Sequence, residues 1–413
     1  MPDGALHLHE GIGLEIELML VDRATLDVRP IADRLLREVS GDDGGDYDAG
    51  TIGWSNELVL HLLELKMSAP AATLEGVAPQ FQANVARIDA LLAKSGATLL
   101  PGGMHPWMDP AKETVLWPHD YAEVYRAYDR LFDCKRHGWA NLQSNHVNLS
   151  FAGDEEFGRL HAAVRLVLPL IPALAASSPF VDGRATGILC NRLTAYRTNS
   201  SRVPALTGDV IPEPVFSIAE YEQRILAPIE REIAKLEPEG ILRGEWLNSR
   251  GAIARFDRNA IEIRLVDAQE CPAADVGVAW AVACLVRGLC EERWCPSAEQ
   301  RRFETSALAA LLDRTTLRGP QALVENLAYA RALGWRGAKS PRAGELWARI
   351  VDDIVAPASG TTQALLEPVR WIERNGTLAE RLLRAAGRDV RRERLREVYG
   401  DLARTLGEGR LFR

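Results

Sequence analysis

The sequence predicts an α+β fold, with a mainly antiparallel sheet in the front of the chain and helices alone behind it. Three segments alternate apolar and polar residues at period two, which is typical of strands with one buried face; they begin at Ile12, His146 and Ile261. Segments with apolar residues every three or four positions lie between them and indicate amphipathic helices. Beyond Pro272 the strand patterns stop, and Ala, Leu, Arg and Glu dominate as far as Leu411. Strands interleaved with helices and then helices alone are typical of the α+β class.

Length and composition place the chain among ordinary globular proteins. It has 413 residues, of which 47% are apolar and 26% charged, so disorder and low complexity are excluded. The formal net charge of −8 provides no global basic field for binding nucleic acid. Six cysteines are too few for a disulfide scaffold in a chain of this length.

Targeting signals are weak in this sequence. The first residues lack the basic region and apolar run of a signal peptide. The longest apolar stretch, Leu166 to Ala176, is too short to cross a bilayer. We therefore expect a soluble cytoplasmic protein without a membrane partner.

The first predicted strand, residues 12–20, carries Glu15 and Glu17 on one face, opposite alternating Ile and Leu residues. A loop rich in Gly and Asp follows from Gly41, and a second extended stretch is expected at residues 57–66. Apolar spacing predicts four helices in this part of the chain, at residues 74–96, 120–136, 155–176 and 218–236, the last with a kink at Pro228.

Between the last two of these predicted helices, residues 177–215 form a long irregular stretch of the kind that usually serves a binding site. The last predicted strand sets Ile261, Ile263 and Leu265 against Glu262, Arg264 and Val266.

Two strand pairs carry the strongest chemical signal. Glu15 and Glu17 share a strand face at a Cβ separation of about 6.6–7 Å, so they need either a cation between them or water around them. Glu262 and Arg264 place a carboxylate and a guanidinium side by side, and the planar fork of arginine suits a phosphate. The structural alternatives are a solvated sheet face for the first pair and an internal salt bridge for the second.

Histidines and further glutamates add candidate ligands. His146 could bind Mg²⁺ or Mn²⁺ among oxygen donors, although a single strand histidine is more often merely packed. Glu57 and Glu64 lie seven positions apart, so in one unbroken strand they reach a common site only if a bulge or bend intervenes; His61 is then the alternative ligand. His105 stands in a GGMHP turn that matches neither the Walker nor the dinucleotide motif.

Six segments follow one another over about residues 10–290: GLEIELMLVD at Gly13, ELVLHLLELKMSAP at Glu57, LLPGGMHPW at Leu99, SNHVNLSF at Ser144, ALAASSPFVDGRATGILCNR at Ala173 and AIEIRLVD at Ala260. Together they resemble glutamate–cysteine ligase family 2, carboxylate–amine ligases related by fold to glutamine synthetase. The resemblance implies a curved, mainly antiparallel sheet of that type, flanked by helices. It places an ATP- and metal-binding catalytic domain in residues 1–290 and a helical region in residues 291–413.

The resemblance also implies a reaction. ATP would phosphorylate the side-chain carboxylate of glutamate, and an amine such as cysteine would attack the acyl phosphate to give a γ-glutamyl amide, ADP and phosphate. The cofactors would be ATP and Mg²⁺ or Mn²⁺, and the partners small-molecule substrates, with a homo-oligomer left open. Phosphoryl transfer depends chiefly on charge neutralisation, which metal ions and an arginine supply.

Carried over position by position, the resemblance makes six residues metal ligands: Glu15, Glu17, Glu57, Glu64, His146 and Glu262. It gives catalytic roles to Glu262, to Arg264 as the phosphate-binding arginine and to Arg192 opposite the substrate carboxylate or phosphate. Arg264, His105 and Asn148 would bind the nucleotide. The family commonly reads HxH where this chain has His146-Val-Asn148, and an amide cannot act as a base.

Two alternative functions remain open from the sequence. One is a small-molecule phosphotransferase on the same fold. The other is a non-catalytic relative that binds a nucleotide or a metal, for which Asn148 is the only support. The C-terminal helices could form an interface or a lid.

Overall fold

The computed structural model of the chain describes residues 5–244, 247–356, 360–388 and 390–413. It contains an antiparallel sheet of eight strands in the order β2-β3-β4-β1-β6-β10-β9, with β5 paired to β1. The predicted α+β class and antiparallel sheet are therefore confirmed. The strands are β1 (Ile12–Asp22), β2 (Asp46–Asp48), β3 (Ile52–Asn56), β4 (Leu62–Met67), β5 (Ala97–Leu100), β6 (Ser144–Ser150), β9 (Ala252–Arg255) and β10 (Ala260–Asp267), with a separate ribbon of β7 (Phe180–Val181) and β8 (Arg184–Ala185).

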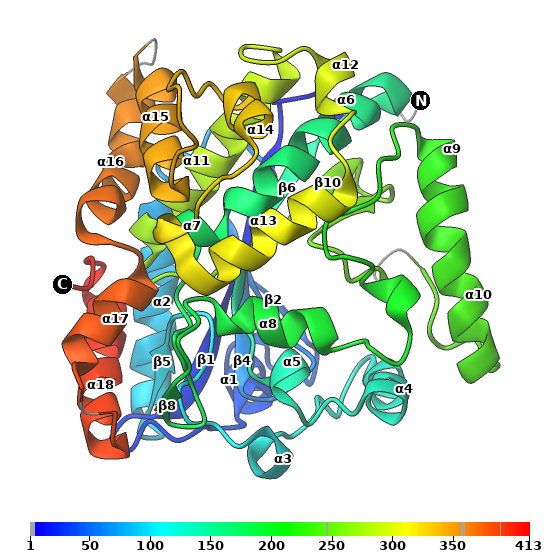
Figure 1. Cartoon of the computed structure of the whole chain (residues 1–413). Coiled ribbons are helices and arrows are strands. Elements are labelled where there is room, and N and C mark those ends of the chain that lie inside the picture. Colours follow the sequence, from blue (N-terminus) through cyan, green and yellow to red (C-terminus); the bar gives the residue numbers. More distant parts are fainter. Residues whose placement is uncertain (1–4, 245–246, 357–359, 389) are drawn as a thin grey trace.

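Helices surround the sheet, and in the described part of the chain after β10 all elements are helical (Figure 1). The helices before that point are α1 (Ala32–Ser40), α2 (Val77–Ala93), α3 (Pro110–Glu113), α4 (Ala122–Phe132), α5 (His137–Ala140), α6 (Gly153–Val167), α7 (Pro172–Ala175), α8 (Asn191–Thr198), α9 (Ile218–Tyr221) and α10 (Ala227–Leu236). Those after it are α11 (Pro272–Cys290), α12 (Ser297–Gln300), α13 (Thr305–Arg318), α14 (Leu327–Ala332), α15 (Ala343–Val355), α16 (Gly360–Asn375), α17 (Leu378–Ala386) and α18 (Arg392–Glu408).

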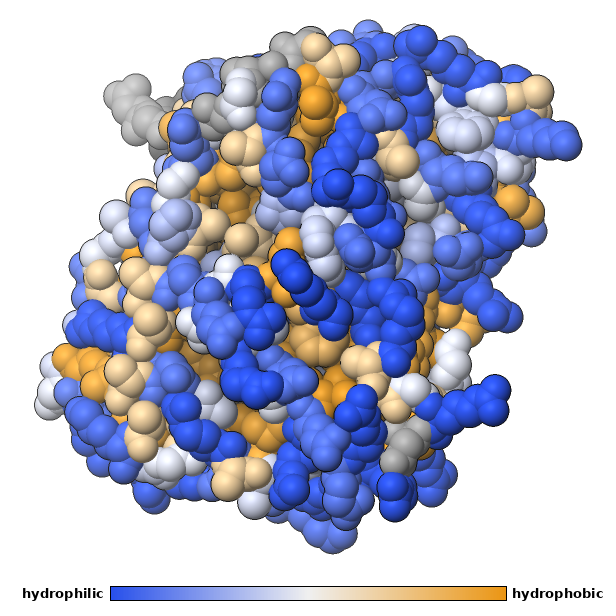
Figure 2. Space-filling view, turned by 90° about the vertical axis from the view of Figure 1, so that its left-hand side faces the viewer, coloured by the Kyte–Doolittle hydropathy of each residue, from blue (hydrophilic) through white to orange (hydrophobic). Residues whose placement is uncertain are grey.

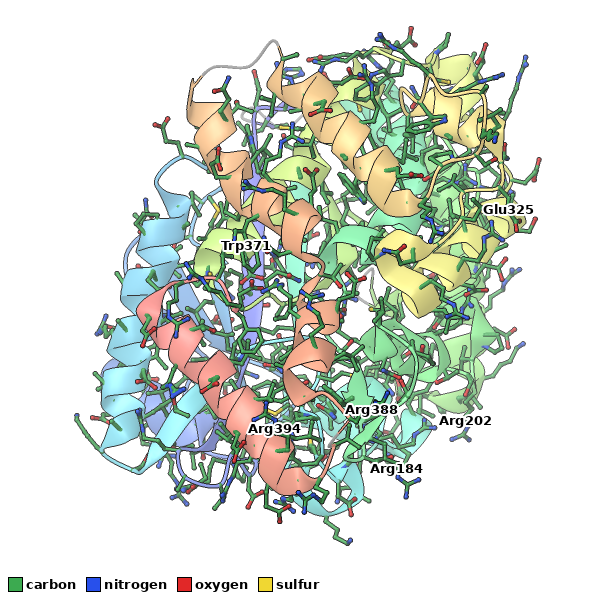
Figure 3. All side chains as sticks on the ribbon, turned by 60° about the vertical axis from the view of Figure 1, so that its left-hand side comes forward. Arg184, Arg202, Glu325, Trp371, Arg388 and Arg394 are labelled. Carbon is green, nitrogen blue, oxygen red and sulfur yellow. The ribbon has the colours of Figure 1, made fainter. Side chains whose placement is uncertain are left out.

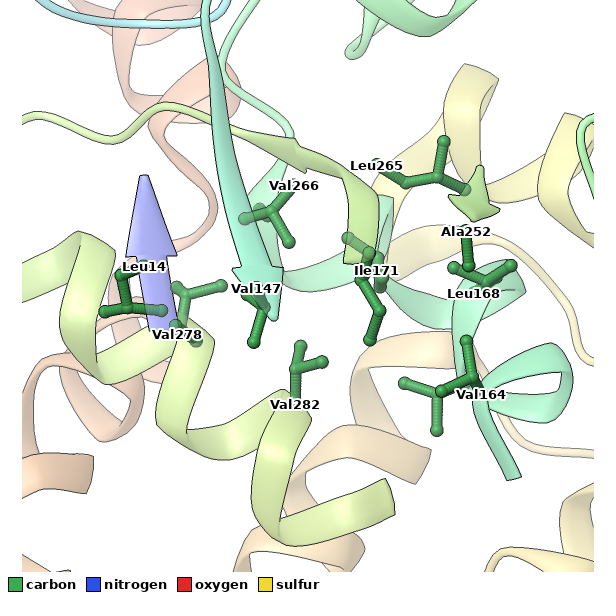
Figure 4. Packing of buried hydrophobic residues seen from close by; sticks show 14 of the residues in the cluster. Leu14, Val147, Val164, Leu168, Ile171, Ala252, Leu265, Val266, Val278 and Val282 are labelled. Atoms are coloured by element: carbon green, nitrogen blue, oxygen red, sulfur yellow. The ribbon is translucent and has the colours of Figure 1, made fainter. Parts of the chain in front are cut away.

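One face of the sheet is apolar and packs against helices. The even-numbered residues of β1 from 12 to 20 are buried in the main apolar cluster, as their alternation predicts. Figure 4 shows Leu14 and Val147 of the sheet close to Val278 and Val282 of α11. The odd-numbered residues of β1 point to the opposite face, where the candidate site lies.

Helix α11 is the central element of this helical layer. Its 19 residues are long and apolar enough to cross a membrane by composition, but 83% of this apolar segment is buried inside the molecule. It contacts β1, β6, α2, α6 and α16. A helix that is apolar on every side is expected in such a core.

The expected single stretch at residues 57–66 is wrong, because the structure has a hairpin there. Strand β3 ends at Asn56, residues 57–61 form the connection, and β4 returns antiparallel with Ser55 opposite Glu64. Glu57 and Glu64 therefore do not belong to one strand, and the parity argument that separated them does not apply.

Strand β10 contains a β-bulge that changes the predicted alternation. Ile263 pairs with Val147, but the next pair is Val266 with Asn145, so β10 has one residue more than its partner. The alternation predicted Val266 on the same face as Arg264. Because of the bulge, Val266 is instead buried in the main apolar cluster. Asp267 takes its place on the polar face and reaches Arg192.

Two predictions in the middle of the chain need smaller corrections. The helix expected at 155–176 ends at Val167 and continues as a 3₁₀ turn and α7, because Pro169 and Pro172 interrupt its hydrogen bonds. Residues 177–215 contain α8 and are not wholly irregular. The helix expected at 218–236 is continuous in the structure, because α9, a π-helical turn at Glu222–Leu226 and α10 follow one another directly. Pro228 is the second residue of α10, and the kink expected there stays a prediction.

The C-terminal helices are packed into the fold. Helices α17 and α18 cover the far end of the sheet's second face, where Met19 and Val21 lie in a smaller apolar cluster with Leu382 and Tyr399. Helix α18 also contacts α2 and β5. The surface that these helices present is mostly hydrophilic, with apolar side chains visible chiefly in recesses (Figure 2). Amphipathic helices that turn their apolar sides inward are expected to give such a surface.

Packing is continuous across residue 290. The main apolar cluster includes residues of α11 and of α13 to α16. Arg381 of α17 forms a buried ion pair with Glu270, 2.7 Å apart, and its guanidinium lies 4.6 Å from the ring centroid of Trp371, which Figure 3 labels. The division into residues 1–290 and 291–413 therefore stays a prediction.

Candidate active site

Strand register brings the predicted acidic residues together on the polar face. Glu15 of β1 lies opposite His146 of β6, and Glu17 lies opposite Glu64 of β4. Glu262 of β10 lies opposite Asn148 of β6. Directly opposite residues in antiparallel strands have Cβ atoms about 4.5–5.5 Å apart, so side chains from four strands converge although they are far apart in sequence.

Short polar side chains orient these carboxylates. The backbone N–H and the hydroxyl of Ser144 donate to Glu17 Oε2 at 2.7 and 2.8 Å. The hydroxyl of Ser55 donates to Glu64 Oε1 at 2.8 Å. Buried carboxylates with such donors are held in defined positions, which favours a site that must keep a fixed geometry.

His146 lies at the centre of the cluster. Its Nδ1 is 3.2 Å from Glu15 Oε2, and its Nε2 is 3.0 Å from the hydroxyl of Ser144. Burial opposes a charge on this ring, but the hydrogen bond with Glu15 and the charge of Glu17 raise the pKa of His146 above its usual value. Burial likewise opposes ionisation of Glu15, yet His146 lowers the pKa of Glu15 to about 2. The two side chains therefore form a buried ion pair.

For two other glutamates, favourable neighbours do not outweigh burial and the repulsion of nearby carboxylates. Burial and the charge of Glu15 raise the pKa of Glu64 to about 8. Burial and the charges of Glu17 and Glu64 raise the pKa of Glu57, in the β3–β4 connection, well above its usual range. Crowded carboxylates in a site of low dielectric repel one another, so the cluster calls for additional positive charge.

The donor set fits a divalent cation. Two groups of three side chains, sharing His146, each place their ligand atoms within 4.8 Å of one another: Glu15, His146 and Glu262, and Glu17, Glu64 and His146. Carboxylate oxygens with an occasional imidazole are ligands for Mg²⁺ and Mn²⁺. The structure thus brings together five of the six predicted ligands in these two groups. The sixth, Glu57, lies close enough to Glu17 and Glu64 for their charges to raise its pKa.

Arg264 lies beside the cluster, as the ExR pattern predicts. Its Nε is 2.8 Å from Glu262 Oε1, and about a quarter of the side chain is exposed. Burial disfavours its charge, but Glu262 more than compensates and raises the pKa of Arg264. A guanidinium held by one carboxylate while still partly open can bind an anion.

Sequence analysis missed three further cations around the site. Arg255 of β9 donates to Glu262 Oε2 at 3.2 Å, and Arg258 of the β9–β10 turn lies 3.7 Å from Glu15 Oε1. Lys66 of β4 lies opposite Glu15 and 3.8 Å from Glu64 Oε1. The turn segment between Arg255 and Ala260 was the available signal, because it marks a hairpin whose first strand must lie next to Glu262.

Two residues expected to bind ligands are committed elsewhere. Arg192 is 1% exposed, with its Nε 2.6 Å from Asp267 and its Nη2 donating to the Arg264 carbonyl at 3.0 Å. Arg192 therefore stabilises β10 through these contacts and does not face the open site. His105 is fully buried, with Nε2 2.8 Å from the Leu26 carbonyl and Nδ1 accepting from the backbone N–H of Trp107. Both of its ring nitrogens are occupied, so a nucleotide contact is not supported.

The alternative ligand His61 is also outside the cluster. It is fully buried, and its Nε2 lies 2.7 Å from the Ala140 carbonyl. Burial lowers the pKa of His61 to about 4, so the ring is neutral and structural.

A cavity of about 650 Å³ opens beside Glu15. Gly11, Gly13 and Gly53 line it, so a ligand can approach the backbone closely. Lys66, Asn148, Arg258 and Asn259 supply hydrogen-bond donors around it. Asn148 also donates to Glu15 Oε1 at 3.2 Å, which connects the cavity to the acidic cluster. The combination of donors and adjoining carboxylates suits a ligand that carries phosphates together with a bound cation.

Comparison with known proteins identifies relatives over most of the chain. The model of the family described as Glutamate-cysteine ligase family 2 (GCS2) matches residues 11–401. An uncharacterized protein of Archaeoglobus fulgidus is 36% identical over 281 residues, covering 68% of this chain and 75% of that protein. A Rubrobacter xylanophilus protein with the provisional name glutamate–cysteine ligase 2-3 is 28% identical over 380 residues, covering 90% of each.

A solved structure shares the fold. It is the glutamate–cysteine ligase of Francisella tularensis in complex with AMP, with a TM-score of 0.61 and 13% identity, covering 98% of this chain and 89% of that chain. The likeness extends over the sheet and the helices together.

Proposed function

Because the chain belongs to glutamate–cysteine ligase family 2, we propose that it is an ATP-dependent ligase that joins the side-chain carboxylate of glutamate to an amine, with cysteine as the leading candidate. ATP transfers its γ-phosphate to the carboxylate, the amine displaces phosphate from the acyl phosphate, and a γ-glutamyl amide forms with ADP and phosphate. The family and the fold support the ligase class. The observation that carries the proposal is the convergence of carboxylates from separate strands on His146.

Each part of the cluster has a task in this proposal. The cations are assigned to the six acidic and imidazole ligands, which are Glu15, Glu17, Glu57, Glu64, His146 and Glu262. Mg²⁺ or Mn²⁺ bound there would neutralise charge on the phosphates. Arg264 binds the transferring phosphoryl group, and Glu262 keeps its guanidinium in place.

The surrounding residues bind and position. Lys66 and Arg258, which line the cavity, would bind the phosphates of ATP, and Asn148, which donates to Glu15, would orient that carboxylate beside them. Arg192 is a positioning residue, because it fixes the backbone of Arg264 from behind. The described cysteines are all free thiols, which agrees with the reducing cytoplasm, where we expect the reaction to occur.

The test is turnover with a panel of substrates. The protein is incubated with ATP, Mg²⁺ or Mn²⁺, glutamate or another amino acid, and a set of amines that includes cysteine. We expect ADP release to require both an acid and an amine, and mass spectrometry to detect their condensed amide. A stable phosphorylated acid without an amide would instead indicate a phosphotransferase, and ADP release that no acid or amine alters would overturn the proposal.

A matched pair of variants tests the site itself. Glu17→Gln keeps the shape of the side chain and removes its charge, so nucleotide turnover should be lost. Glu230→Gln, on the exposed surface of α10, is the control and should keep full turnover. If Glu17→Gln changed only nucleotide affinity and left turnover intact, the non-catalytic alternative would be favoured.

A further inference from the structure

A second cavity lies on the helix side of the sheet, at the same end as the first. Its volume is about 300 Å³, at the lower end of the range of about 300–1,000 Å³ found for small-molecule sites. Apolar side chains from β1, β6, α6, α11 and α15 form its walls, namely Ile12, Leu149, Leu160, Ala283 and Ile354. It is separate from the acidic cluster, whose side chains point to the other face.

Charged groups line one side of this cavity and leave a positive balance. Arg287 and Arg293 both line it, together with a single carboxylate, Glu291. The Nε of Arg287 donates to Glu291 Oε1 at 2.7 Å, and Arg293 Nη2 is 3.5 Å from Glu291 Oε2. Two guanidinium groups therefore share one carboxylate. About half of the Arg287 side chain is exposed, so it can turn its free N–H groups to an incoming anion.

The remaining lining adds an aromatic side chain and a thiol. Trp280, which is 8% exposed, lines the cavity on α11, and the half-buried Cys284 stands beside the apolar wall. His9 completes the lining, and burial together with the charge of Arg287 lowers its pKa, so the ring is neutral. The cavity thus combines an apolar body with one net positive end.

The two cavities adjoin each other and share two lining residues. Gly11 and Ser150 line both of them. The backbone N–H of Gly11 donates to Ser150 Oγ at 2.9 Å, and the backbone N–H of Ser150 donates to the Gly11 carbonyl at 3.0 Å. A Cβ on Gly11 would lie 2.7 Å from Leu6 Cδ1, so only glycine fits there without displacing a neighbour.

We propose that the helix-side cavity is a second small-molecule site, which takes an organic carboxylate with a compact apolar body. The apolar part fills the space between α6, α11 and β1, and the carboxylate pairs with Arg287 and Arg293 at the open end. This site is independent of the reaction assigned to the acidic cluster, and its occupant is bound without being changed.

Calorimetry with two matched probes tests the proposal. Phenylacetate supplies an apolar ring and a carboxylate, and phenylacetamide has the same shape without the charge. We expect phenylacetate to bind the purified protein with a Kd below about 1 mM and phenylacetamide to bind at least five times more weakly. No detectable binding of phenylacetate, or equal binding of the two probes, would overturn the proposal.

Two variants locate the binding. Arg287→Gln removes one charge at the exposed end and should weaken phenylacetate binding at least fivefold, whereas Ala283→Leu fills the cavity and should abolish it. Cys284 gives an independent readout, because phenylacetate should slow its alkylation by N-ethylmaleimide, measured by peptide mass spectrometry. Thermal unfolding checks that both variants are folded. Binding that neither variant weakens, with Cys284 unprotected, would place the probe elsewhere and refute the assignment.

Discussion

Buried histidines on the two sides of the sheet have pKa values that are shifted in opposite directions. His161, on the helix side, is 1% exposed and lies among Phe157, Phe216 and Tyr221. Burial, followed by the charge of Arg165, lowers the pKa of His161 to about 3. His146, on the polar face, is 6% exposed, yet its carboxylate neighbours raise its pKa. Burial alone does not decide the charge of a side chain; the groups that surround it do.

The same contrast separates stability from function along single strands. On the apolar face, the burial of each side chain stabilises the folded state. The polar face gathers carboxylates whose repulsion opposes folding until positive charge is added. Substitutions on neighbouring residues of one strand should therefore affect different properties.

In the comparison of the two faces within one strand, the largest effect is expected for Glu64→Gln on the polar face of β4. The substitution keeps the hydrogen bond from Ser55 within reach but removes a ligand charge, so kcat should fall about 100- to 1,000-fold. The melting temperature of the metal-free protein should stay the same or rise, because Glu64 is held near unfavourable negative charge. Steady-state ADP release and calorimetry measure the two effects. A variant that melted much earlier while keeping its activity would reverse the assignment of this face.

Leu65→Ala, one residue later on the apolar face, should show the opposite result. Leu65 is fully buried in the main cluster, and removing its side chain should lower the free energy of unfolding by about 3 kcal/mol. Urea denaturation measures this loss. Activity per folded molecule should remain within about twofold of the parent enzyme. A loss of kcat as large as that of Glu64→Gln would show that the two faces are not functionally separate.

The comparison of histidines predicts a pH dependence of stability. Because the folded pKa of His161 is about 3 and its unfolded value about 6.5, the unfolded state alone binds a proton between these values. The contribution of the neutral His161 to the free energy of unfolding is therefore complete above pH 6.5. It is lost as the pH falls toward 3, by about 1.4 kcal/mol per pH unit.

His161→Phe should remove that contribution while preserving the aromatic packing. Between pH 7 and pH 5 the variant should lose about 2 kcal/mol less unfolding free energy than the parent protein. His61 and His105 are also buried with lowered pKa values, but they are present in both proteins and cancel in the difference. Parallel pH profiles in urea titrations would contradict a neutral buried His161.

The smallest effect is expected at Asn148, the departure from the family pattern. Asn148→Ala removes one hydrogen bond to Glu15, so the KM for ATP should rise about two- to tenfold with little change in kcat. Asn148→His should restore a donor at this position and bring KM back toward the parent value. An effect on kcat comparable to that of Glu64→Gln would instead make Asn148 part of the reaction itself.

Much of the site could be predicted because strand periodicity is a local property. The alternation in β1 assigned Glu15 and Glu17 to the face opposite the core, and the alternation in β6 and β10 did the same for His146 and Glu262. Glu57 was harder, since nothing in its segment showed that a hairpin rather than one strand joins it to Glu64. The supporting cations Arg255, Arg258 and Lys66 were missed because their roles depend on which strand lies beside which.

The sequence by itself determined which residues share a face in β1, in β6 and in β10 before its bulge, since period two is set by the backbone of the strand alone. Only the tertiary structure decided the register that sets Glu17 against Glu64 and Glu15 against His146, the bulge that moves Val266 into the core, and the ion pair that turns Arg192 toward Asp267. Register and pairing depend on contacts between segments that are far apart in the sequence, and no local pattern contains them.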